Sequence, residues 1–375
     1  MKYYVIAGEA SGDLHASNLI GCLKIYDSFA QFRGWGGNLM KTQGVEICKH
    51  INDLAFFGIS EVIGNLRTIS NNFKLCKQDI ITFNPDVLIL VDYPGFNLRI
   101  AKFAKLKGIK VFYYISPTIW AWHQSRIYII KKFVDKMFVI LPFEKEFYKK
   151  FNVDVEYEGH PLLDAIEHEQ NNFLSKNEFC TKYNLLNKPI IAVLPGSRKN
   201  EIKRKLPLMM KVVNHFNEYQ FVIAGTNSVP IDFYKQFLIS DDVKIIFGKT
   251  YQILKIADTA IVTSGTATLE TALFNVPQVV CYKTSFLTYV IAKIFVKVKY
   301  ISLVNIILNK GAITELIQNK LTLKNLIKEL KLLTNSSKRE QIIEDYKKLN
   351  SLIGSVGASQ RIAKQMIDLL KPNKG

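Results

Sequence analysis

Two carboxylates and two glycines interrupt an apolar run near the start of the chain. The run YYVIA, from residue 3, passes into GEASGD, whose members include Gly8, Glu9, Ser11, Gly12 and Asp13. The spacing is not a dinucleotide fingerprint, because the third glycine is missing, and it is not a P-loop, because no Gly-Lys-Ser/Thr follows. Carboxylates would also repel a bound diphosphate. We therefore expect a turn that faces sugar hydroxyls, although a tight turn with a helix cap explains the pattern equally well, with Asp13 as an acid near a helix N-terminus.

A single carboxylate follows the next strongly apolar run, in PDVLILVDYPGFN at residues 85–97. Ligands of parallel sheets bind beyond the carboxyl ends of the strands, which is where Asp92 would lie. A lone carboxylate at that position suits a general base that takes a proton from an attacking hydroxyl. Helix capping, shared with Gly95 and Asn97, is the alternative.

The second half of the chain carries two glycine turns with the opposite chemistry. The first, in IIAVLPGSRKNEI at 190–202, supplies Gly196, Ser197, Arg198 and Glu201; the second, in TAIVTSGTATLETAL at 259–273, supplies Ser264, Gly265, Thr266, Thr268 and Glu270. Free amides, hydroxyls and an arginine at helix starts are suited to phosphate, and Glu270 to ribose hydroxyls. A capping box is the alternative for the second turn, but Thr266 and Glu270 are one residue too far apart for it.

These turns need parallel sheets to position them. Apolar runs near 3–8, 86–92, 109–115, 136–141, 155–158, 190–195, 221–225, 243–247, 259–263 and 277–282 predict strands. Helical patterns such as 98–107 and 142–151 alternate with them, which indicates βαβ units. Because ten strands exceed one such sheet and 160–189 has no strand pattern, we expect two α/β domains, 1–165 and 166–356, with a C-terminal helix at about 357–371 that packs back on the first.

Composition limits the partners. The 375 residues are 48% hydrophobic, with 50 lysines and arginines against 32 acids and a net charge of +18, which favours a polyanionic partner such as anionic lipid, nucleic acid or a phosphorylated substrate. A basic surface without a partner is the alternative. The five scattered cysteines, the dispersed histidines and the absence of D-x-D predict neither a disulfide framework nor a metal site, and we expect no cofactor. No signal peptide is expected, and three lysines within the apolar stretch from Ser285 argue against a membrane span.

Seven motifs in order resemble the lipid-A-disaccharide synthase family of GT-B glycosyltransferases. They are AGEASGD, VDYPGFN, SPTIWAW, LPFEKEFY, EGHPLLD, LPGSRKNEI and SGTATLE, spread from residue 7 to residue 270. The resemblance implies two Rossmann-like domains whose parallel sheets face a central cleft. It also implies a metal-independent, inverting glycosyltransferase of lipopolysaccharide biosynthesis in a Gram-negative bacterium.

The resemblance further implies the substrates and the residues that act on them. A 2,3-diacylglucosamine would pass from its UDP derivative to the 6-hydroxyl of 2,3-diacylglucosamine 1-phosphate, giving a β-1,6 disaccharide and UDP. Asp92 would be the base, with Glu9 and the 8–13 turn on the acceptor side together with Trp120. Arg198, the 264–268 turn and Glu270 would bind UDP, together with Asn305 and Glu315. Val304 and Thr314 stand where the family usually has prolines, so the loop geometry around Asn305 and Glu315 is a point for the structure to decide.

Acylated substrates would give the basic and apolar surface a purpose. An apolar stripe at helical spacing comprises Ile59, Val62, Ile63, Leu66, Ile69 and Phe73. We interpret it as a face that contacts acyl chains or an anionic membrane; a helix that faces the core is the commoner explanation. Trp120 likewise lines an acyl or sugar pocket or is simple packing. We therefore expect a cytoplasmic protein that is peripherally associated with the inner face of the inner membrane. An oligomer is compatible with this expectation.

Two other functions compete with this interpretation. A UDP-N-acetylglucosamine 2-epimerase would share the metal-free UDP site, but its expected histidine-rich acidic loop is not visible in the sequence. An RNA-binding protein is favoured only by the net charge, and no RNA-binding motif is found, so we expect no nucleic-acid partner.

Overall fold

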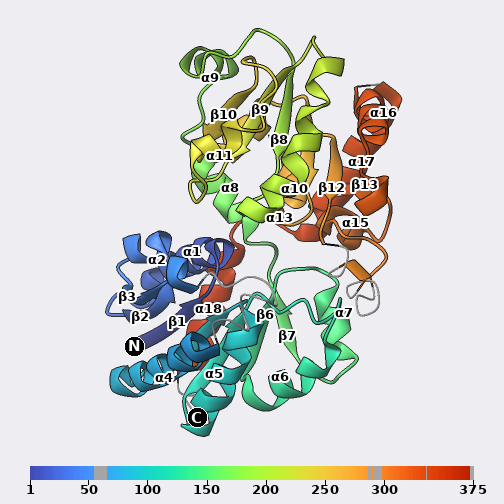
Figure 1. Ribbon diagram of the computed structural model, residues 1–375. Helices are drawn as coiled ribbons and strands as arrows, with labels where there is room; N and C mark the ends of the chain where they lie inside the picture. The colour runs from blue at the N-terminus through green and yellow to red at the C-terminus, as the bar shows by residue number, and fades with distance from the viewer. Residues whose placement is uncertain (55–65, 286–288, 291–297, 335, 372–375) are drawn as a thin grey trace. The chain divides into compact units, whose positions relative to one another are not determined.

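The chain folds into two compact units, each built on its own sheet. The structure is a computed structural model that describes residues 1–54, 66–285, 289–290, 298–334 and 336–371. The first unit comprises Met1–His168 and the residues from Ile353 onward, and the second comprises Glu169–Leu352. Figure 1 shows both units as sheets flanked by helices. The prediction of an α/β protein with two Rossmann-like units is confirmed.

The first unit has a seven-stranded parallel sheet. Its order is β3-β2-β1-β4-β5-β6-β7. The strands are β1 (Lys2–Ala7), β2 (Gln31–Gly36), β3 (Glu46–His50), β4 (Val87–Val91), β5 (Lys110–Tyr114), β6 (Lys136–Val139) and β7 (Val155–Tyr157). The chain first adds strands on one side of β1 and then on the other. The reversal between β1 and β4 is a topological switch point, the usual ligand position in such sheets.

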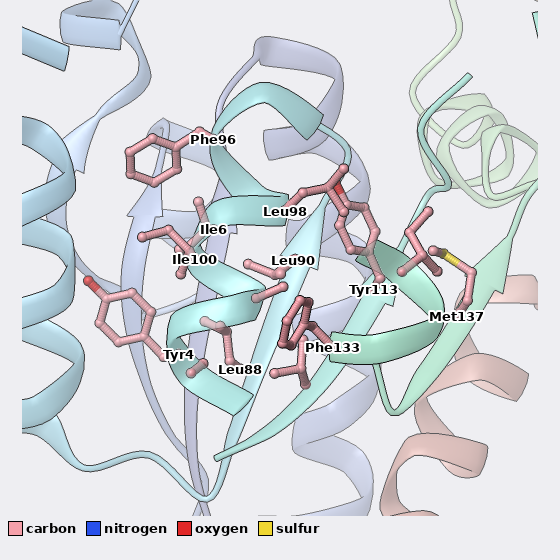
Figure 2. Close-up of a cluster of buried hydrophobic side chains, with 14 of the residues drawn as sticks. Tyr4, Ile6, Leu88, Leu90, Phe96, Leu98, Ile100, Tyr113, Phe133 and Met137 are labelled. Carbon is pink, nitrogen blue, oxygen red and sulfur yellow. The ribbon is translucent and has the colours of Figure 1, made fainter. Parts of the chain in front are cut away.

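Alternate strand residues face opposite sides of this sheet and build two cores. Tyr4, Ile6, Leu88 and Leu90 face one side, where Figure 2 shows them beside Phe96, Leu98 and Ile100 of α5 and Phe133 of α6. The intervening residues, such as Val5 and Ile89, face the other side. The near-continuous apolar strands follow from burial on both faces.

The helices of the first unit cover both faces of its sheet. They are α1 (Ala10–Tyr26), α2 (Asn38–Thr42), α4 (Leu66–Phe83), α5 (Pro94–Leu106), α6 (Ile127–Phe133), α7 (Glu144–Lys149) and α18 (Ala358–Leu370), with α8 (Leu162–Gln170) leading into the second unit and short 3₁₀ helices η1 (Ile51–Leu54) and η2 (Gln124–Arg126). Helix α18, from the far end of the chain, packs along α1 (Figure 1). Its apolar stripe, including Ile362 and Met366, joins the core that contains Leu19 and Leu23 of α1.

The second unit repeats the arrangement with six parallel strands in the order β10-β9-β8-β11-β12-β13. Its strands are β8 (Ile190–Leu194), β9 (Gln220–Gly225), β10 (Lys244–Phe247), β11 (Thr259–Thr263), β12 (Gln278–Tyr282) and β13 (Thr314–Ile317). Its helices are α9 (Lys176–Lys182), α10 (Lys199–Met210), α11 (Ile231–Lys235), α12 (Thr250–Ile256), α13 (Thr266–Leu273), α15 (Leu303–Leu308), α16 (Leu323–Leu333) and α17 (Ser336–Ile353), with 3₁₀ helices η3 (Val213–His215) and η4 (Gln318–Lys320). The switch point here lies between β8 and β11.

All ten predicted strands are present, but β2, β3 and β13 are strands that the sequence did not predict. Strand β2, QFRGWG, contains glycine because β1 lies so close: a Cβ at Gly34 would be 1.9 Å from the carbonyl oxygen of Val5. Strand β3, EICKH, lies at the sheet edge and is only partly buried. Neither strand shows the apolar run that marks the central ones.

Two buried histidines lie beside the segment that leaves the first unit. His15 of α1 is 5% exposed and His160 is 1% exposed, with their rings edge-on and 6.5 Å apart. The Nδ1 atom of His160 accepts the backbone N–H of Leu162, and the backbone N–H of His160 donates to the carbonyl of Ile353. Burial lowers the pKa of His15 to about 4, although the charge of Asp164 opposes the shift. Burial and then His15 lower the pKa of His160 to about 3.

We predict that the first unit loses stability as the pH falls from about 6.5 towards about 4. In that window the unfolded histidines bind protons and the folded ones do not, so each contributes at most about 1.4 kcal/mol per pH unit. Replacing His160→Asn, whose side-chain oxygen replaces Nδ1 as acceptor, should flatten the dependence of the unfolding free energy on pH. The exposed His168→Asn is the matched control and should leave the slope unchanged. An unaltered slope in the His160 variant would contradict the prediction.

Candidate functional site

Two turns meet at the switch point of the first unit. The β1–α1 turn follows Ala7 and the β4–α5 turn follows Val91, and these two residues are register partners on neighbouring strands. Because parallel strands end at the same edge, the pairing brings the turn that contains Glu9 next to the turn that contains Asp92.

The β4–α5 turn has an unusual backbone that the fold holds in place. Asp92 and Tyr93 both have left-handed conformations, with φ of 46° and 48°. Such a conformation costs roughly 1–3 kcal/mol for each non-glycine residue and persists only where its surroundings fix it. The Asp92 N–H donates to the Tyr114 carbonyl (3.1 Å), and the Asp92 carbonyl accepts the Tyr113 hydroxyl (2.6 Å) and the Asn97 side-chain amide (2.8 Å). The bend therefore sets the direction of the Asp92 side chain.

The setting of the Asp92 carboxyl makes it a stronger base than usual. Burial and then the charge of Glu9 raise its pKa to about 7, and a hydrogen bond from the Tyr93 N–H only partly opposes the shift. A group with that pKa changes protonation near neutral pH, which is where general bases are most effective.

Gly8 is required because the Tyr93 ring lies over it. A Cβ atom at Gly8 would lie 2.4–2.7 Å from three ring carbons of Tyr93. The same ring stacks on Phe96 (5.6 Å between centroids), so it ties the two turns to the core. Gly12 is also close-packed, since its Cβ would lie 3.4 Å from that of Ala7.

Asp13 supports a neighbouring helix. Its buried carboxylate accepts backbone N–H groups from Gly37 (2.7 Å), Leu39 (3.0 Å) and Met40 (3.1 Å), at the start of α2. The sequence analysis placed Asp13 as an acid near the start of its own helix; in the structure its carboxylate binds the N–H groups at the start of α2 instead. Ser11, in the first turn of α1, is exposed.

Trp120 packs beside a buried glutamate that the sequence did not single out. Its ring is edge-on to Phe143, 5.0 Å between centroids. Glu144 accepts the N–H groups of Ile140 (3.2 Å) and Leu141 (2.9 Å). Burial raises the pKa of Glu144 to about 7, against these bonds and the nearby side chains of Ser116 and Trp120. These contacts favour the packing alternative for Trp120.

The predicted apolar stripe falls only partly within the described residues. Ile59, Val62 and Ile63, together with the side chain of Leu66, lie outside them. Ile69 is half-buried. Phe73 stacks on Phe96 at 4.5 Å, and the Arg99 guanidinium lies over its ring. Phe73 therefore packs on the core of the first unit.

At the switch point of the second unit, the turn after β8 holds Arg198 beside a carboxylate. Arg198 is the N-cap residue of α10, and its guanidinium donates to Glu201 (3.2 Å). Gly196 has a left-handed φ of 121°, and a Cβ there would lie 2.5 Å from a Glu201 oxygen. Ser197 is exposed.

The turn after β11 is open. Gly265 has φ of 140°, and no atom lies within 4 Å of the position that its Cβ would occupy. The Ser264 hydroxyl donates to the carbonyl of Ile301 (2.9 Å), and that of Thr268 donates to Gly265 (2.8 Å). Thr266 is exposed at the first position of α13, and the N–H of Thr268 donates to the carbonyl of Gly265 (3.2 Å).

A hollow of about 230 Å³ lies next to Glu270, lined by Glu169, Gly248, Thr250, Tyr251 and Glu270. The Tyr251 hydroxyl donates to a Glu270 oxygen (3.2 Å). Burial raises the pKa of Glu270 to about 7; Tyr251 opposes the shift and Glu169 adds to it. The sequence analysis missed Tyr251. Its signal is the strand, glycine and helix start of IIFGKTYQ, the same pattern as in the two turns that were recognised.

Asn305 and Glu315 hold their own loop together. Glu315 accepts the Ser302 N–H (2.9 Å), the Ser302 hydroxyl (2.6 Å) and the Asn305 amide (2.9 Å). Asn305 also exchanges hydrogen bonds with the backbone of Ile313. Val304 is buried in α15, and the Thr314 hydroxyl donates to Glu329. The loop is therefore closed by polar contacts without the two prolines.

Across the described parts of the chain, no group of three or more histidine, cysteine, aspartate or glutamate side chains could hold a metal ion. Within the same ranges, no helix has the length and apolar character needed to cross a membrane.

A family model described as lipid-A-disaccharide synthetase matches residues 3–367. The chain belongs to this family. It is therefore a glycosyltransferase that acts in lipid A biosynthesis. A lipid-A-disaccharide synthase of Syntrophus aciditrophicus is 39% identical, covering 98% of this chain and 97% of the relative. One from Coxiella burnetii (strain CbuK_Q154) is 38% identical, covering 98% of each chain.

Solved structures share the fold at low identity. S. aureus MnaA, in a co-structure with UDP, matches with a TM-score of 0.69 at 14% identity, covering 98% of this chain and 96% of that one. A glycotransferase of kitacinnamycin matches with a TM-score of 0.63 at 12% identity, covering 99% of each. Several of the matching structures are UDP-N-acetylglucosamine 2-epimerases, such as that of Methanocaldococcus jannaschii, at a TM-score of 0.66 and 12% identity, covering 98% of this chain and 100% of that one. The fold is thus GT-B, and the family membership disfavours the epimerase alternative.

We predict that Asp13→Ala destabilises the first unit by about 1–3 kcal/mol, because three buried N–H groups lose their acceptor. Chemical denaturation of the purified protein measures the change. Ser11→Ala, at the exposed start of the same helix, is the matched control and should change stability by less than about 0.5 kcal/mol. Equal stability of both variants would show that the hydrogen bonds between Asp13 and the start of α2 do not contribute to the free energy of unfolding.

Proposed function

We propose that the enzyme transfers a 2,3-diacylglucosamine unit from its UDP derivative to the 6-hydroxyl of 2,3-diacylglucosamine 1-phosphate. The products are a β-1,6-linked disaccharide 1-phosphate and UDP. The observation that carries the proposal, within a family of disaccharide synthases, is the Asp92 carboxyl at the first switch point, with its pKa raised to about 7.

The first unit supplies the acceptor side in this proposal. The ionised Asp92 carboxylate takes the proton of the 6-hydroxyl while the hydroxyl oxygen attacks the anomeric carbon of the donor. Attack from the side opposite the leaving group inverts that carbon. Glu9 has two roles: its charge keeps the Asp92 proton affinity high, and its carboxylate accepts hydrogen bonds from sugar hydroxyls.

The second unit supplies the donor side. The nucleoside occupies the hollow beside Tyr251, where the Glu270 carboxylate accepts hydrogen bonds from the ribose. The amides of the Ser264–Thr268 turn and the guanidinium of Arg198 receive the diphosphate. When the bond between the anomeric carbon and the phosphate oxygen breaks, its electron pair stays with UDP. Arg198 and the helix amides stabilise that charge without a divalent ion.

The substrates carry acyl chains, so the enzyme must meet them at a lipid surface. The net charge of +18 suits an anionic bilayer, where each nearby lysine contributes about 1 kcal/mol. We propose reversible binding to the inner face of the inner membrane, with the stripe from Ile59 to Ile69 as the apolar contact.

We predict that the purified protein forms one disaccharide per UDP released from synthetic 2,3-diacylglucosamine substrates. Mass spectrometry of the product and an assay for free UDP measure this directly. A UDP-sugar isomer without a disaccharide would support the epimerase alternative and contradict the proposal.

Turnover is expected to persist in excess chelator, because the stabilisation of the leaving group is assigned to Arg198 and the backbone amides and not to a metal ion.

We predict that kcat/KM rises with pH up to about 7, because Asp92 must be ionised to act and its pKa is about 7 in the free protein. Asp92→Asn should reduce turnover by ~10²-fold or more, the usual contribution of a positioned base. Glu9→Gln should move the acid limb of the profile to lower pH, because it removes a charge that raises the Asp92 pKa. Circular dichroism and thermal melting are the folding controls. If the acid limb of the Glu9→Gln profile does not move, the charge of Glu9 does not raise the pKa of Asp92. Near-normal turnover of folded Asp92→Asn would exclude Asp92 as the general base.

A further inference from the structure

A buried lysine lies beneath the two glycine turns of the second unit. Lys205 of α10 is 3% exposed, and its ammonium donates to the hydroxyl of Thr263. Thr263 is the last residue of β11 and directly precedes Ser264, where the open turn begins. The ammonium thus lies at the carboxyl end of β11, one of the two central strands of this sheet.

Strand register brings the other turn to the same place. Thr263 is paired with Cys281 of β12, and Val262 is paired with Leu194, the last residue of β8. Leu194 leads directly to the turn that contains Gly196. The Lys205 ammonium therefore lies near the carboxyl ends of β8, β11 and β12. Strands β8 and β11 lead into the two glycine turns.

Burial of a lysine at this position needs an explanation. Lysine is almost never fully buried unless it is paired, since removing its charge from water is costly. Lys203 and Arg204, its neighbours on α10, are exposed. Burial lowers the pKa of Lys205, whereas the charge of Glu201 opposes the shift and favours the protonated form.

The lysine also belongs to a row of charges along α10. Arg198, Glu201 and Lys205 follow one another at spacings of three and four residues, which places them on one face of the helix. The Arg198 guanidinium donates to Glu201, and Glu201 is the largest charge acting on Lys205. With one carboxylate between two cations, the row carries a net positive charge, and it lies beside Gly196 at Glu201 and beside Thr263 at Lys205.

We propose that Lys205 is a positioning residue for the donor diphosphate. It supplies a fixed positive charge under the Ser264–Thr268 turn, and it holds Glu201 so that Arg198 is presented to the phosphates. This inference rests on the proposed donor site of the second unit. It implies that Lys205 contributes to the binding of phosphates and not to the binding of the nucleoside, which the hollow beside Tyr251 receives.

Isothermal titration of the full-length protein with UDP, UMP and uridine separates these contributions. Lys205→Met removes the charge and should weaken UDP binding by roughly tenfold, as expected for one buried charge interaction, while uridine affinity stays unchanged. Lys205→Gln keeps a donor for Thr263 without the charge, and it should lose UDP affinity while keeping uridine affinity. This variant tests the inference even if Lys205→Met does not fold. Lys205→Arg should retain most of the preference for UDP. Lys203→Met, at an exposed position on the same helix, is the matched control and should bind all three ligands as the native protein does.

Glu270→Gln gives the contrasting pattern, because a residue that binds the ribose should affect UDP and uridine equally. A parallel loss of UDP and uridine affinity in the Lys205 variants would show a general structural role and overturn the inference. Unchanged UDP affinity in folded Lys205→Gln would overturn it as well, with the donor site intact. A native protein that binds no UDP would overturn the donor site itself, and the inference with it.

Discussion

The left-handed bend at Asp92 and Tyr93 is the constraint on which the chemistry of the first unit depends. Three groups from β5 and α5 bind the backbone of Asp92, and they offset the strain of two adjacent non-glycine residues at positive φ. These three bonds go to backbone atoms, so the carboxyl, which accepts the Tyr93 N–H, keeps its remaining acceptor positions for substrate. The bend also places the Tyr93 ring over Gly8. This contact fixes the β1–α1 turn and so the position of the Glu9 carboxylate. One backbone geometry thus determines both the direction and the proton affinity of Asp92.

The second unit uses the same switch point with the opposite charge. Its turns rely on Gly196 and Gly265 for their positive φ, so backbone amides approach a ligand without side chains in the way. Where the first unit gathers carboxylates, the second gathers Arg198 and Lys205 around the single carboxylate of Glu201. Carboxylates suit neutral hydroxyls and repel phosphates, and cations do the reverse. The two copies of one topology thus differ in the charge that they gather at the switch point, which is why we propose sugar hydroxyls as ligands for the first and phosphates for the second.

The sequence predicted those features that follow from local pattern. Buried parallel strands read as apolar runs, and their polar ends mark the ligand edge, so Asp92, Arg198 and Ser264 were found where the structure places them. Strand β2 was missed because Gly34 is required by the close approach of the β1 backbone, a tertiary contact that the local sequence does not show. The partners of Asp13 lie more than twenty residues along the chain, at the start of a helix too short to be predicted. Asn305 and Glu315 were assigned to the donor side only through the family resemblance, and the hydrogen bonds by which they close their own loop depend on partners that local pattern does not show.

Two carboxyls, Asp92 and Glu270, have pKa values raised to about 7, and burial is the first cause in both. Their neighbours nevertheless separate their roles. Asp92 lies beside another carboxylate, so it gains affinity for a proton and can take one from a hydroxyl at neutral pH. Glu270 already accepts a hydrogen bond from the Tyr251 hydroxyl, next to the hollow that both residues line. A raised pKa alone would assign both as bases. The group beside each carboxyl, a second carboxylate for Asp92 and a hydroxyl donor for Glu270, is therefore the basis on which we propose a proton-transfer role for the first and a ligand-binding role for the second.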